Sequence, residues 1–319
     1  MRFLLDTEQA EFGRTLDRLL TAAETPDVIR AWSSGDHGPG RALWSRLGGT
    51  GVFALTVPEA YDGAGFLPVE LAVSYVELGR FGVPGPIVET AAAARLLDCL
   101  PDVAKEWLPG IASGDVAVSL GVDGSYVLDA DSADAVFVVR GDELRLASGH
   151  GPLLPSADPA RRLYAPAEGG TLLARGPDVR DAAARAVDLA AFLTAAQSLG
   201  VGLSLLHRTV EYATQRTQFG APIGSFQAVK HRLADALTGL EFARPLVFGA
   251  ALSLAPGDIA AAKVAAGEAS YAAARAALQL HGAIGYTQEL DLSLWLRKAR
   301  PLRDAWGAPA ACRARVLGG

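Results

Sequence analysis

Two turns between apolar helical stretches carry polar side chains that a plain turn does not require. The first, RTQFGAPIGSFQ, offers the guanidinium of Arg216 and the amides of Gln218 and Gln227. An arginine beside a helix N-terminus makes a good pyrophosphate site, because guanidinium and backbone N–H groups both donate to phosphate oxygens. In the second, QLHGAIGYT, Gln279 precedes small residues that let a ligand approach the backbone closely. Both turns therefore have the chemistry of a nucleotide site.

The same residues also have a plain structural interpretation. An arginine before a turn is commonly a helix C-terminal cap that the helix dipole favours. The stretch Gly-Ala-Pro-Ile-Gly, residues 220–224, is compatible with a tight connector, and no Walker or GxGxxG phosphate loop occurs in the chain. The residues by themselves leave both interpretations open.

Helical periodicity surrounds both turns. Apolar residues recur at three- and four-residue spacing from Leu189 to Leu206, and again from Phe226 to Leu240. Further breaks at Pro256-Gly257-Asp258 and at residues 281–285 divide the C-terminal part into four helices. Short turns between long helices predict an antiparallel four-helix bundle over residues 181–319.

The first two thirds of the chain divide into two further regions. Residues 1–112 contain stretches with helical apolar spacing, separated by Gly- and Pro-containing turns. Residues 113–180 contain short β-rich runs such as DVAVSLG, AVFVV and TLLAR, which predict a small antiparallel sheet or barrel. We therefore expect a mainly α protein with an N-terminal helical domain, a reduced middle β domain and a C-terminal bundle.

Composition excludes several classes of function. Half of the 319 residues are hydrophobic and a fifth are charged, as in a globular protein, and a net charge of −6 with scattered basic residues argues against a nucleic-acid interface. The two cysteines, Cys99 and Cys312, form no CxxC pair, so we expect neither a metal site nor a disulfide framework. Acidic residues near the N-terminus argue against a signal peptide, and we find no apolar run near the roughly 20 residues that span a bilayer. We expect a cytoplasmic protein.

Three stretches resemble signatures of the acyl-CoA dehydrogenase family. RTQFGAPIGSFQAVKHRLAD (216–235) and QLHGAIGYTQELDLSLWLRKAR (279–300) resemble its two C-terminal signatures. LWSRLGGTGVFALTVPEAYDGAGFLPVELAVSYVELGR (43–80) resembles its N-terminal Trp…Gly…Pro-Glu-x-x-Gly-Gly-x-Gly stretch. The resemblance covers both helical regions, and the helix–sheet–bundle order is the architecture of the family.

The resemblance implies a flavin site shared between subunits. In the family, the first turn contacts the FAD of a neighbouring subunit, and the Gln-x-x-Gly-Gly turn holds the ADP half of that FAD. Ala283 stands where the second glycine is usual, which tightens the turn without destroying it. Carried over residue by residue, the cofactor-binding set is Arg216, Gln218, Phe219, Phe226, Gln227, Gln279, Gly282 and Ala283.

The chain departs from the family at the catalytic base. Removing the α-proton of a thioester requires a positioned carboxylate, and the usual glutamate position falls here on Trp306. A smaller group of relatives places the base on the first bundle helix, where this chain has Ala190. Asp188 is turned by about 200° from that position on a helix, and Asp304 lies two residues early in a region disturbed by Pro301. We therefore expect no catalytic residue in this chain, with Asp304 as a solvated acid.

The β region also lacks family features. The segment SLGVDGSYVLDADSADAVFVV, residues 119–139, contains neither the Thr-Glu-Pro loop nor the Trp-Ile-Thr strand that wrap the flavin ring in the family. Loss of base and ring pocket with retention of the ADP contacts resembles the short subunit of α2β2 heterotetrameric acyl-CoA dehydrogenases that act on CoA thioesters of steroid (cholesterol) side chains. The implied partner is a longer catalytic subunit. Two alternatives stay open: a self-sufficient homotetramer that uses Asp304, and a flavin-free scaffold protein with the same fold.

Overall fold

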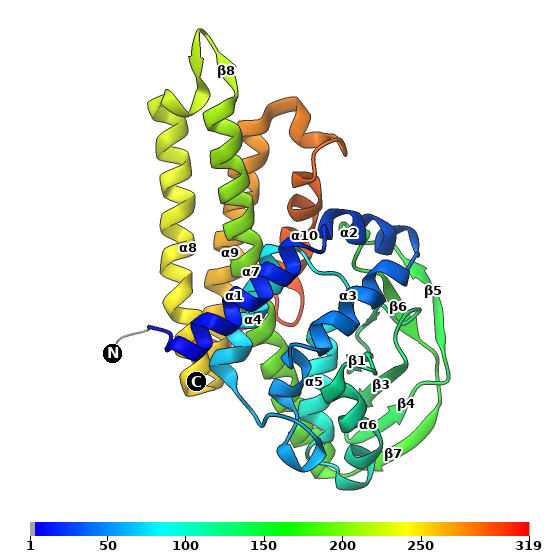
Figure 1. Ribbon diagram of the computed structural model, residues 1–319. Coiled ribbons are helices and arrows are strands. Elements are labelled where there is room, and N and C mark those ends of the chain that lie inside the picture. The colour runs from blue at the N-terminus through cyan, green and yellow to red at the C-terminus, as the bar shows by residue number, and fades with distance from the viewer. Residues whose placement is uncertain (1–3, 319) are drawn as a thin grey trace. The chain divides into compact units, whose positions relative to one another are not determined.

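Helices make up most of the chain (Figure 1). The computed structural model describes residues 4–318. The helices before the first strand are α1 (Thr7–Thr21), α2 (Thr25–Ser34), α3 (Gly38–Gly48), η1 (Val52–Thr56), η2 (Glu59–Tyr61), α4 (Pro68–Arg80), α5 (Ile87–Leu97) and α6 (Pro101–Ser113). Asp6 caps α1, because its side chain accepts a hydrogen bond from the Gln9 backbone N–H at 2.8 Å. Gly114, with a φ of 80°, ends α6.

The strands form a small β region of two sheets. They are β1 (Val118–Val122), β2 (Val127–Leu128), β3 (Ala135–Arg140), β4 (Glu143–Leu146), β5 (His150–Leu154), β6 (Leu163–Pro166) and β7 (Thr171–Arg175). One sheet has the order β1-β3-β4-β7 and the other the order β2-β6-β5. A mainly α fold with a small β region is therefore confirmed.

The expectation of a purely antiparallel sheet is wrong at one pair of strands. β1 pairs with β3 in parallel, with Val118 opposite Ala135. Parallel neighbours need a crossover connection, and β2 belongs to the second sheet, so the chain leaves the first sheet after β1 and returns to it in the same direction. The short β-rich runs show which residues form strands but carry no signal for this crossover.

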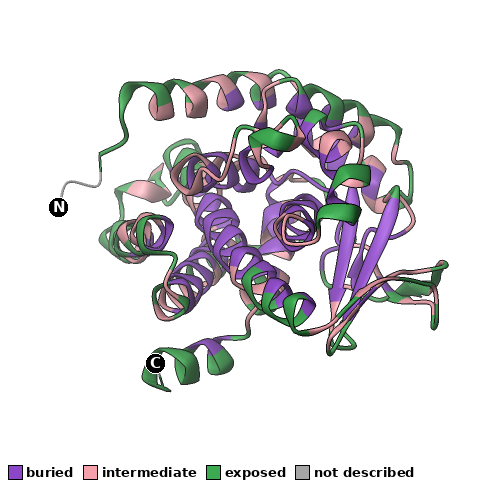
Figure 2. Ribbon diagram, turned by 90° about the horizontal axis from the view of Figure 1, so that it is seen from below, coloured by how far each residue is buried: buried purple, intermediate pink, exposed green. Residues whose placement is uncertain are grey.

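The C-terminal part is helical again. Its elements are α7 (Pro177–Gln215), β8 (Thr217–Gln218), β9 (Ala221–Pro222), η3 (Ile223–Ser225), α8 (Gln227–Ser253), α9 (Pro256–His281), η4 (Gly282–Tyr286), α10 (Leu292–Asp304) and α11 (Pro309–Gly318). α8, α10 and α11 all pack on α9. The buried Lys263 of α9 donates to the carbonyl oxygens of Leu302 (3.0 Å) and Arg303 (2.8 Å), which caps the end of α10. Buried residues follow one side of many helices and run along several strands (Figure 2).

The residues group into two compact units. The first takes in the residues up to Pro26, Ala72–Gly82 and the chain from Ala191 onward. The second takes in Asp27–Leu71 and Val83–Ala190. Each unit combines stretches that are far apart in the sequence. The division into three consecutive domains, residues 1–112, 113–180 and 181–319, remains a prediction.

Two glycines let α4 and α7 approach closely inside the first unit. A Cβ on Gly200 would lie 2.0 Å from the carbonyl oxygen of Val76, and one on Gly79 would lie 2.1 Å from that of Gln197. Real side chains essentially never make such contacts, so both positions require glycine at this helix crossing. The crossing fixes the part of α7 that leads to the first polar turn.

The expectation that no apolar run reaches membrane-spanning length is wrong for α7. By length and composition alone this helix could cross a bilayer, but 83% of its most apolar stretch is buried inside the protein. Core helices of globular proteins pass the same test, because a helix packed on all sides is apolar on all sides.

Candidate functional site

The first polar turn is a β-hairpin at the end of α7. Gln218 of β8 pairs with Ala221 of β9, so Phe219 and Gly220 form a two-residue loop, which projects past the helix ends (Figure 1). Both loop residues have positive φ, 52° and 78°, as a type I′ turn requires. A bulky side chain is uncommon in this conformation and marks a position where strain and function often coincide.

Residues of this hairpin present polar and aromatic groups outward. The Phe219 side chain is 95% exposed, and its ring lies 6.3 Å from the ring of Phe226 in an edge-on arrangement. Arg216 is exposed, and within residues 4–318 its guanidinium makes no hydrogen bond or ion pair, so its side chain does not cap the last carbonyl groups of α7 by hydrogen bonding. The Gln218 amide donates to the carbonyl oxygen of Thr217 at 2.8 Å. The hairpin therefore offers an available cation and two rings to another molecule.

The start of α8 adds backbone donors to this end of the helices. Gln227 is the first residue of α8 and is exposed, and the preceding Phe226 supplies no side-chain cap. The first N–H groups of an uncapped helix are free to donate to an anion, and the helix dipole favours negative charge there. An oxygen-rich ligand such as a phosphate suits this position.

The second polar turn ends α9 at the same end of the helices. Tyr212 of α7 stacks on His281 of α9 with ring centroids 4.1 Å apart, which holds the two helix ends together. Burial lowers the pKa of His281, so the ring packs as a neutral aromatic group. Gly282 has φ 63° and ψ −138°, which is essentially accessible only to glycine. Ala283 after it is exposed.

The structure adds neighbours to Gln279 that the sequence motifs did not indicate. A pocket of about 430 Å³ lies between α8 and α9, and its lining includes Gln279, Arg232, Arg275 and Tyr286. Gln279 is the only predicted cofactor residue in this lining, and the others lie in or beside the hairpin, at the start of α8 or in the turn after α9. Arg275 precedes Gln279 by four residues, a spacing that places both on one face of a helix and could have indicated the pair.

Comparison with known proteins assigns the chain to a family. Residues 6–115 match the model described as acyl-CoA dehydrogenase, N-terminal domain, and residues 180–316 match that of the acyl-CoA dehydrogenase C-terminal domain. Acyl-CoA dehydrogenase IpdE2 of Mycobacterium tuberculosis is 36% identical over 297 residues, which cover 92% of this chain and 91% of the relative. The chain belongs to the acyl-CoA dehydrogenase family.

Solved structures share the fold of this acyl-CoA dehydrogenase chain. The ChsE4-ChsE5 complex from Mycobacterium tuberculosis contains a chain with a TM-score of 0.85 and 24% identity, covering 100% of this chain and 98% of that one. The G363A variant of the Tcur3481-Tcur3483 steroid ACAD gives the same TM-score and identity, covering 98% of this chain and 97% of that chain. The architecture expected from the family resemblance is thereby confirmed.

The positions where the family resemblance places a catalytic base hold no acid. Ala190 is fully buried in α7. Trp306 follows α10 and is half-buried, with a φ of 53°. Asp304, the last residue of α10, is exposed, and its Oδ2 accepts from Arg300 Nε at 3.3 Å. This is the geometry of a solvated surface ion pair, and such pairs contribute little to the stability of a protein.

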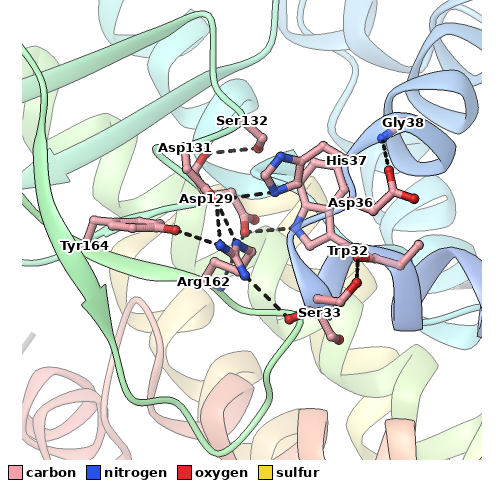
Figure 3. Close-up of polar contacts among 12 residues, drawn as sticks. Trp32, Ser33, Asp36, His37, Gly38, Asp129, Asp131, Ser132, Arg162 and Tyr164 are labelled. Atoms are coloured by element: carbon pink, nitrogen blue, oxygen red, sulfur yellow. Dashed lines mark hydrogen bonds and ion pairs between the residues drawn. The ribbon is translucent and has the colours of Figure 1, made fainter.

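The second unit of this acyl-CoA dehydrogenase chain contains a polar cluster that no sequence motif indicated (Figure 3). Arg162 donates to Asp131 Oδ2 from Nε at 2.9 Å and to the Tyr164 hydroxyl at 3.1 Å. His37 Nε2 lies 3.4 Å from the same Asp131 oxygen. Burial by itself would raise the pKa of Asp131, but the hydrogen bonds from Arg162 and Tyr164 and the nearby positive charge outweigh it and lower that pKa. Asp131 is therefore a stable anion that joins the start of α3 to β6.

The pKa of a second aspartate in the cluster, Asp129, is shifted in the opposite direction. Asp129 is fully buried, and its Oδ1 accepts from Trp32 Nε1 at 3.0 Å and from the Arg162 backbone N–H at 3.3 Å. Burial above all, together with the nearby charge of Glu89, raises the pKa of Asp129 to about 7. Asp129 therefore gains its proton near neutral pH, far above the usual range of an aspartate.

Proposed function

We propose that this chain is the non-catalytic subunit of a heteromeric, FAD-dependent acyl-CoA dehydrogenase of the cytoplasm. The complex introduces an α,β double bond into the CoA thioester of a steroid side chain. A longer catalytic subunit supplies the carboxylate base and the pocket for the flavin ring. This chain completes that subunit's FAD site by contacting the ADP half.

The observation that carries the proposal is the outward-facing hairpin. Phe219 keeps a strained backbone conformation while its ring is almost wholly exposed, so packing within this chain does not offset the strain. Arg216 beside it has no acidic partner in residues 4–318. Contact with another molecule would offset the backbone strain at Phe219 and would give the Arg216 guanidinium a partner.

The residues fit the ADP half of FAD. A pyrophosphate requires positive charge and N–H donors, which Arg216 and the uncapped start of α8 provide. The polar edge of adenine requires donors and acceptors, which the exposed amide of Gln279 provides. Gly282 allows close approach of the ligand to the backbone. When FAD is bound, its ring accepts hydride from the β-carbon of the thioester.

The tasks left to this chain are binding and orientation. Arg216 neutralises phosphate charge, and the rings of Phe219 and Phe226 exclude water from one side of the cofactor. No proton transfer is assigned to this chain, because Ala190 and Trp306 carry no titratable group and Asp304 is held in an exposed ion pair. The α-proton therefore goes to a carboxylate of the partner.

Relatives support the heteromeric and steroid parts of the proposal. The structurally similar ChsE4-ChsE5 assembly is a complex of two differently named chains. The similar Tcur3481-Tcur3483 assembly is described as a steroid ACAD. Both likenesses extend over nearly the full length of this chain, which supports the proposal of a similar assembly.

The test is flavin stoichiometry after co-expression with the longer subunit. We expect two FAD per tetramer, measured from the flavin-to-protein absorbance ratio and native mass. Arg216→Ala should weaken FAD retention about tenfold or more, since a hydrogen bond to a charged group contributes about 1.5–3 kcal/mol. Lys230→Ala, which removes another exposed cation near the start of α8, is the matched control and should keep its flavin.

Four outcomes would contradict the proposal. Four FAD per tetramer, or a variant at Arg216 that retains all its flavin, would contradict the cross-subunit site. A yellow, active homo-oligomer of this chain alone would instead support a self-sufficient enzyme using Asp304. A colourless chain that binds neither flavin nor a longer subunit would support a scaffold protein.

A further inference from the structure

One aromatic pair connects the two polar turns, which lie at the same end of the helices (Figure 1). Tyr212, in the last turn of α7, stacks on His281, the last residue of α9, with ring centroids 4.1 Å apart and ring planes 22° apart. Both residues belong to the first compact unit. Aromatic rings attract each other in only a few arrangements, so a stacked pair fixes an orientation as well as a distance.

The hairpin is attached directly to Tyr212. The Arg216 backbone N–H donates to the Tyr212 carbonyl oxygen at 2.8 Å, and the Arg216 carbonyl oxygen accepts from the Ile223 N–H at 2.8 Å. These two hydrogen bonds join both strands of the hairpin to the end of α7, because β8 follows Arg216 and Ile223 follows β9. Gly224 lies against the same helix end, since a Cβ there would be 3.0 Å from the Ala213 carbonyl oxygen. The base of the hairpin therefore moves with Tyr212.

The second turn is attached to His281. This residue is 6% exposed, and its Nδ1 donates to the Ala277 carbonyl oxygen at 2.8 Å, because a carbonyl oxygen only accepts. The hydrogen bond fixes the orientation of the ring. Gly282 follows directly in the chain, and a Cβ on Gly285 would lie 3.2 Å from the Cβ of His281, so η4 folds back over the histidine. Gln279 precedes His281 by two residues, so His281 sets the position of the whole turn.

The two helices already run close together before they reach this pair. A Cβ on Gly202 of α7 would lie 3.0 Å from the Cα of Ser270 in α9. Gly202 and Ser270 lie about three helical turns before Tyr212 and His281. The stacked pair is therefore a second point of contact between the same two helices. Two contact points along a pair of helices fix their relative direction, which one contact point does not.

We propose that Tyr212 and His281 are positioning residues that set the spacing between the hairpin and the turn after α9, so that one cofactor molecule contacts both. The inference rests on the proposed function, which places Arg216 and Gln279 on the same FAD. A ligand that spans two contact points binds most tightly when their spacing is set before binding, because less ordering is then required. Neither ring has to touch the cofactor for this effect.

The test measures bound flavin in the co-purified complex, equilibrated at a series of FAD concentrations. Tyr212→Leu and His281→Leu should each raise the half-saturating FAD concentration about two- to tenfold, the range expected for loss of an aromatic pair. The maximum amount of bound flavin should stay unchanged, whereas a folding defect would lower that maximum. The double variant should raise the half-saturating concentration no further than the larger single effect, because either substitution removes the same contact.

Two further variants serve as controls. Tyr212→Phe keeps the ring and should bind FAD as the wild type does. Tyr271→Leu is matched in chemistry, because Tyr271 is half-buried on α9 and packs against the guanidiniums of Arg300 and Arg303, about 15 Å along the helix from His281. Its half-saturating FAD concentration should equal that of the wild type. The thermal midpoint of each complex checks that folding is retained.

The outcomes separate this inference from the proposed function. Flavin loss in Arg216→Ala with wild-type binding in Tyr212→Leu and His281→Leu would overturn the inference and leave the proposed function standing. Wild-type binding in all three would overturn both. A lower maximum of bound flavin at an unchanged half-saturating concentration would leave the pair a role in folding alone and overturn the inference. If His281→Leu does not assemble, the Leu and Phe variants of the half-buried Tyr212 decide the question: equal binding by these two would overturn the inference.

Discussion

Replacing Asp129 by asparagine should stabilise the protein near neutral pH and not in acid. The folded pKa of Asp129 is about 7, whereas its ordinary value is 3.8. Between these values the unfolded chain has released the proton and the folded chain has not, so raising the pH favours unfolding. This contribution is opposite in sign to that of a salt-bridged aspartate. It changes little below about pH 3.8 and levels off above about pH 7.

The magnitude follows from the two pKa values. A difference of about three pH units corresponds to about 4 kcal/mol of unfolding free energy at pH 8, and about 3 kcal/mol of this develops between about pH 4.5 and pH 8. Asparagine keeps an acceptor for Trp32 Nε1 and tolerates the φ of 52° at this position. Its amide leaves a donor near the Oδ2 position, which has no partner, at a cost of about 1–3 kcal/mol. That cost does not depend on pH, so the pH dependence is the diagnostic quantity.

The assay is urea unfolding of wild type and Asp129→Asn at several pH values, followed by far-UV circular dichroism and tryptophan fluorescence. We expect the difference in unfolding free energy to move by about 3 kcal/mol in favour of the variant between about pH 4.5 and pH 8. Glu106→Gln, at an exposed carboxylate of the same unit, is the control for loss of one charge. A difference that stays constant over this range would refute the assignment of a buried, neutral Asp129.

Asp304→Asn should leave turnover of the complex nearly unchanged, because the carboxylate is exposed in a surface ion pair; a fall of about 10²- to 10⁴-fold with flavin retained would identify it as the base. Phe219→Ala should alter the free energy of unfolding by less than about 0.5 kcal/mol, since the ring is 95% exposed, yet should lower flavin content. Equal flavin content in variant and wild type would count against the hairpin contact. Gly79→Ala should destabilise by about 1–3 kcal/mol or prevent folding, because its Cβ would lie 2.1 Å from the Gln197 carbonyl oxygen. Gly257→Ala, at a helical glycine with open space around it, is the comparison and should be neutral in urea unfolding.

Sequence periodicity predicted the local elements well. Apolar spacing and the breakers around Pro256 and Gly282 indicated the C-terminal helices, because a helix buries one face every 3.6 residues and ends where proline or glycine interrupts it. The two polar turns were recognisable for the same reason, as polar residues that interrupt an apolar pattern. Their role as cofactor contacts remains a prediction, carried by the family resemblance.

Tertiary structure decided what depends on contacts between distant residues. The parallel pairing of β1 with β3 requires a crossover through the second sheet, and no local pattern encodes it. The groove that joins Arg232 to Arg275 forms because two helices pack side by side, so neither arginine stands out among the 29 basic residues of the sequence. The protonation of Asp129 near neutral pH likewise follows from complete burial. Spacing along the chain determines which residues share a face of an element, whereas packing between elements determines which faces meet and which charges lose their water.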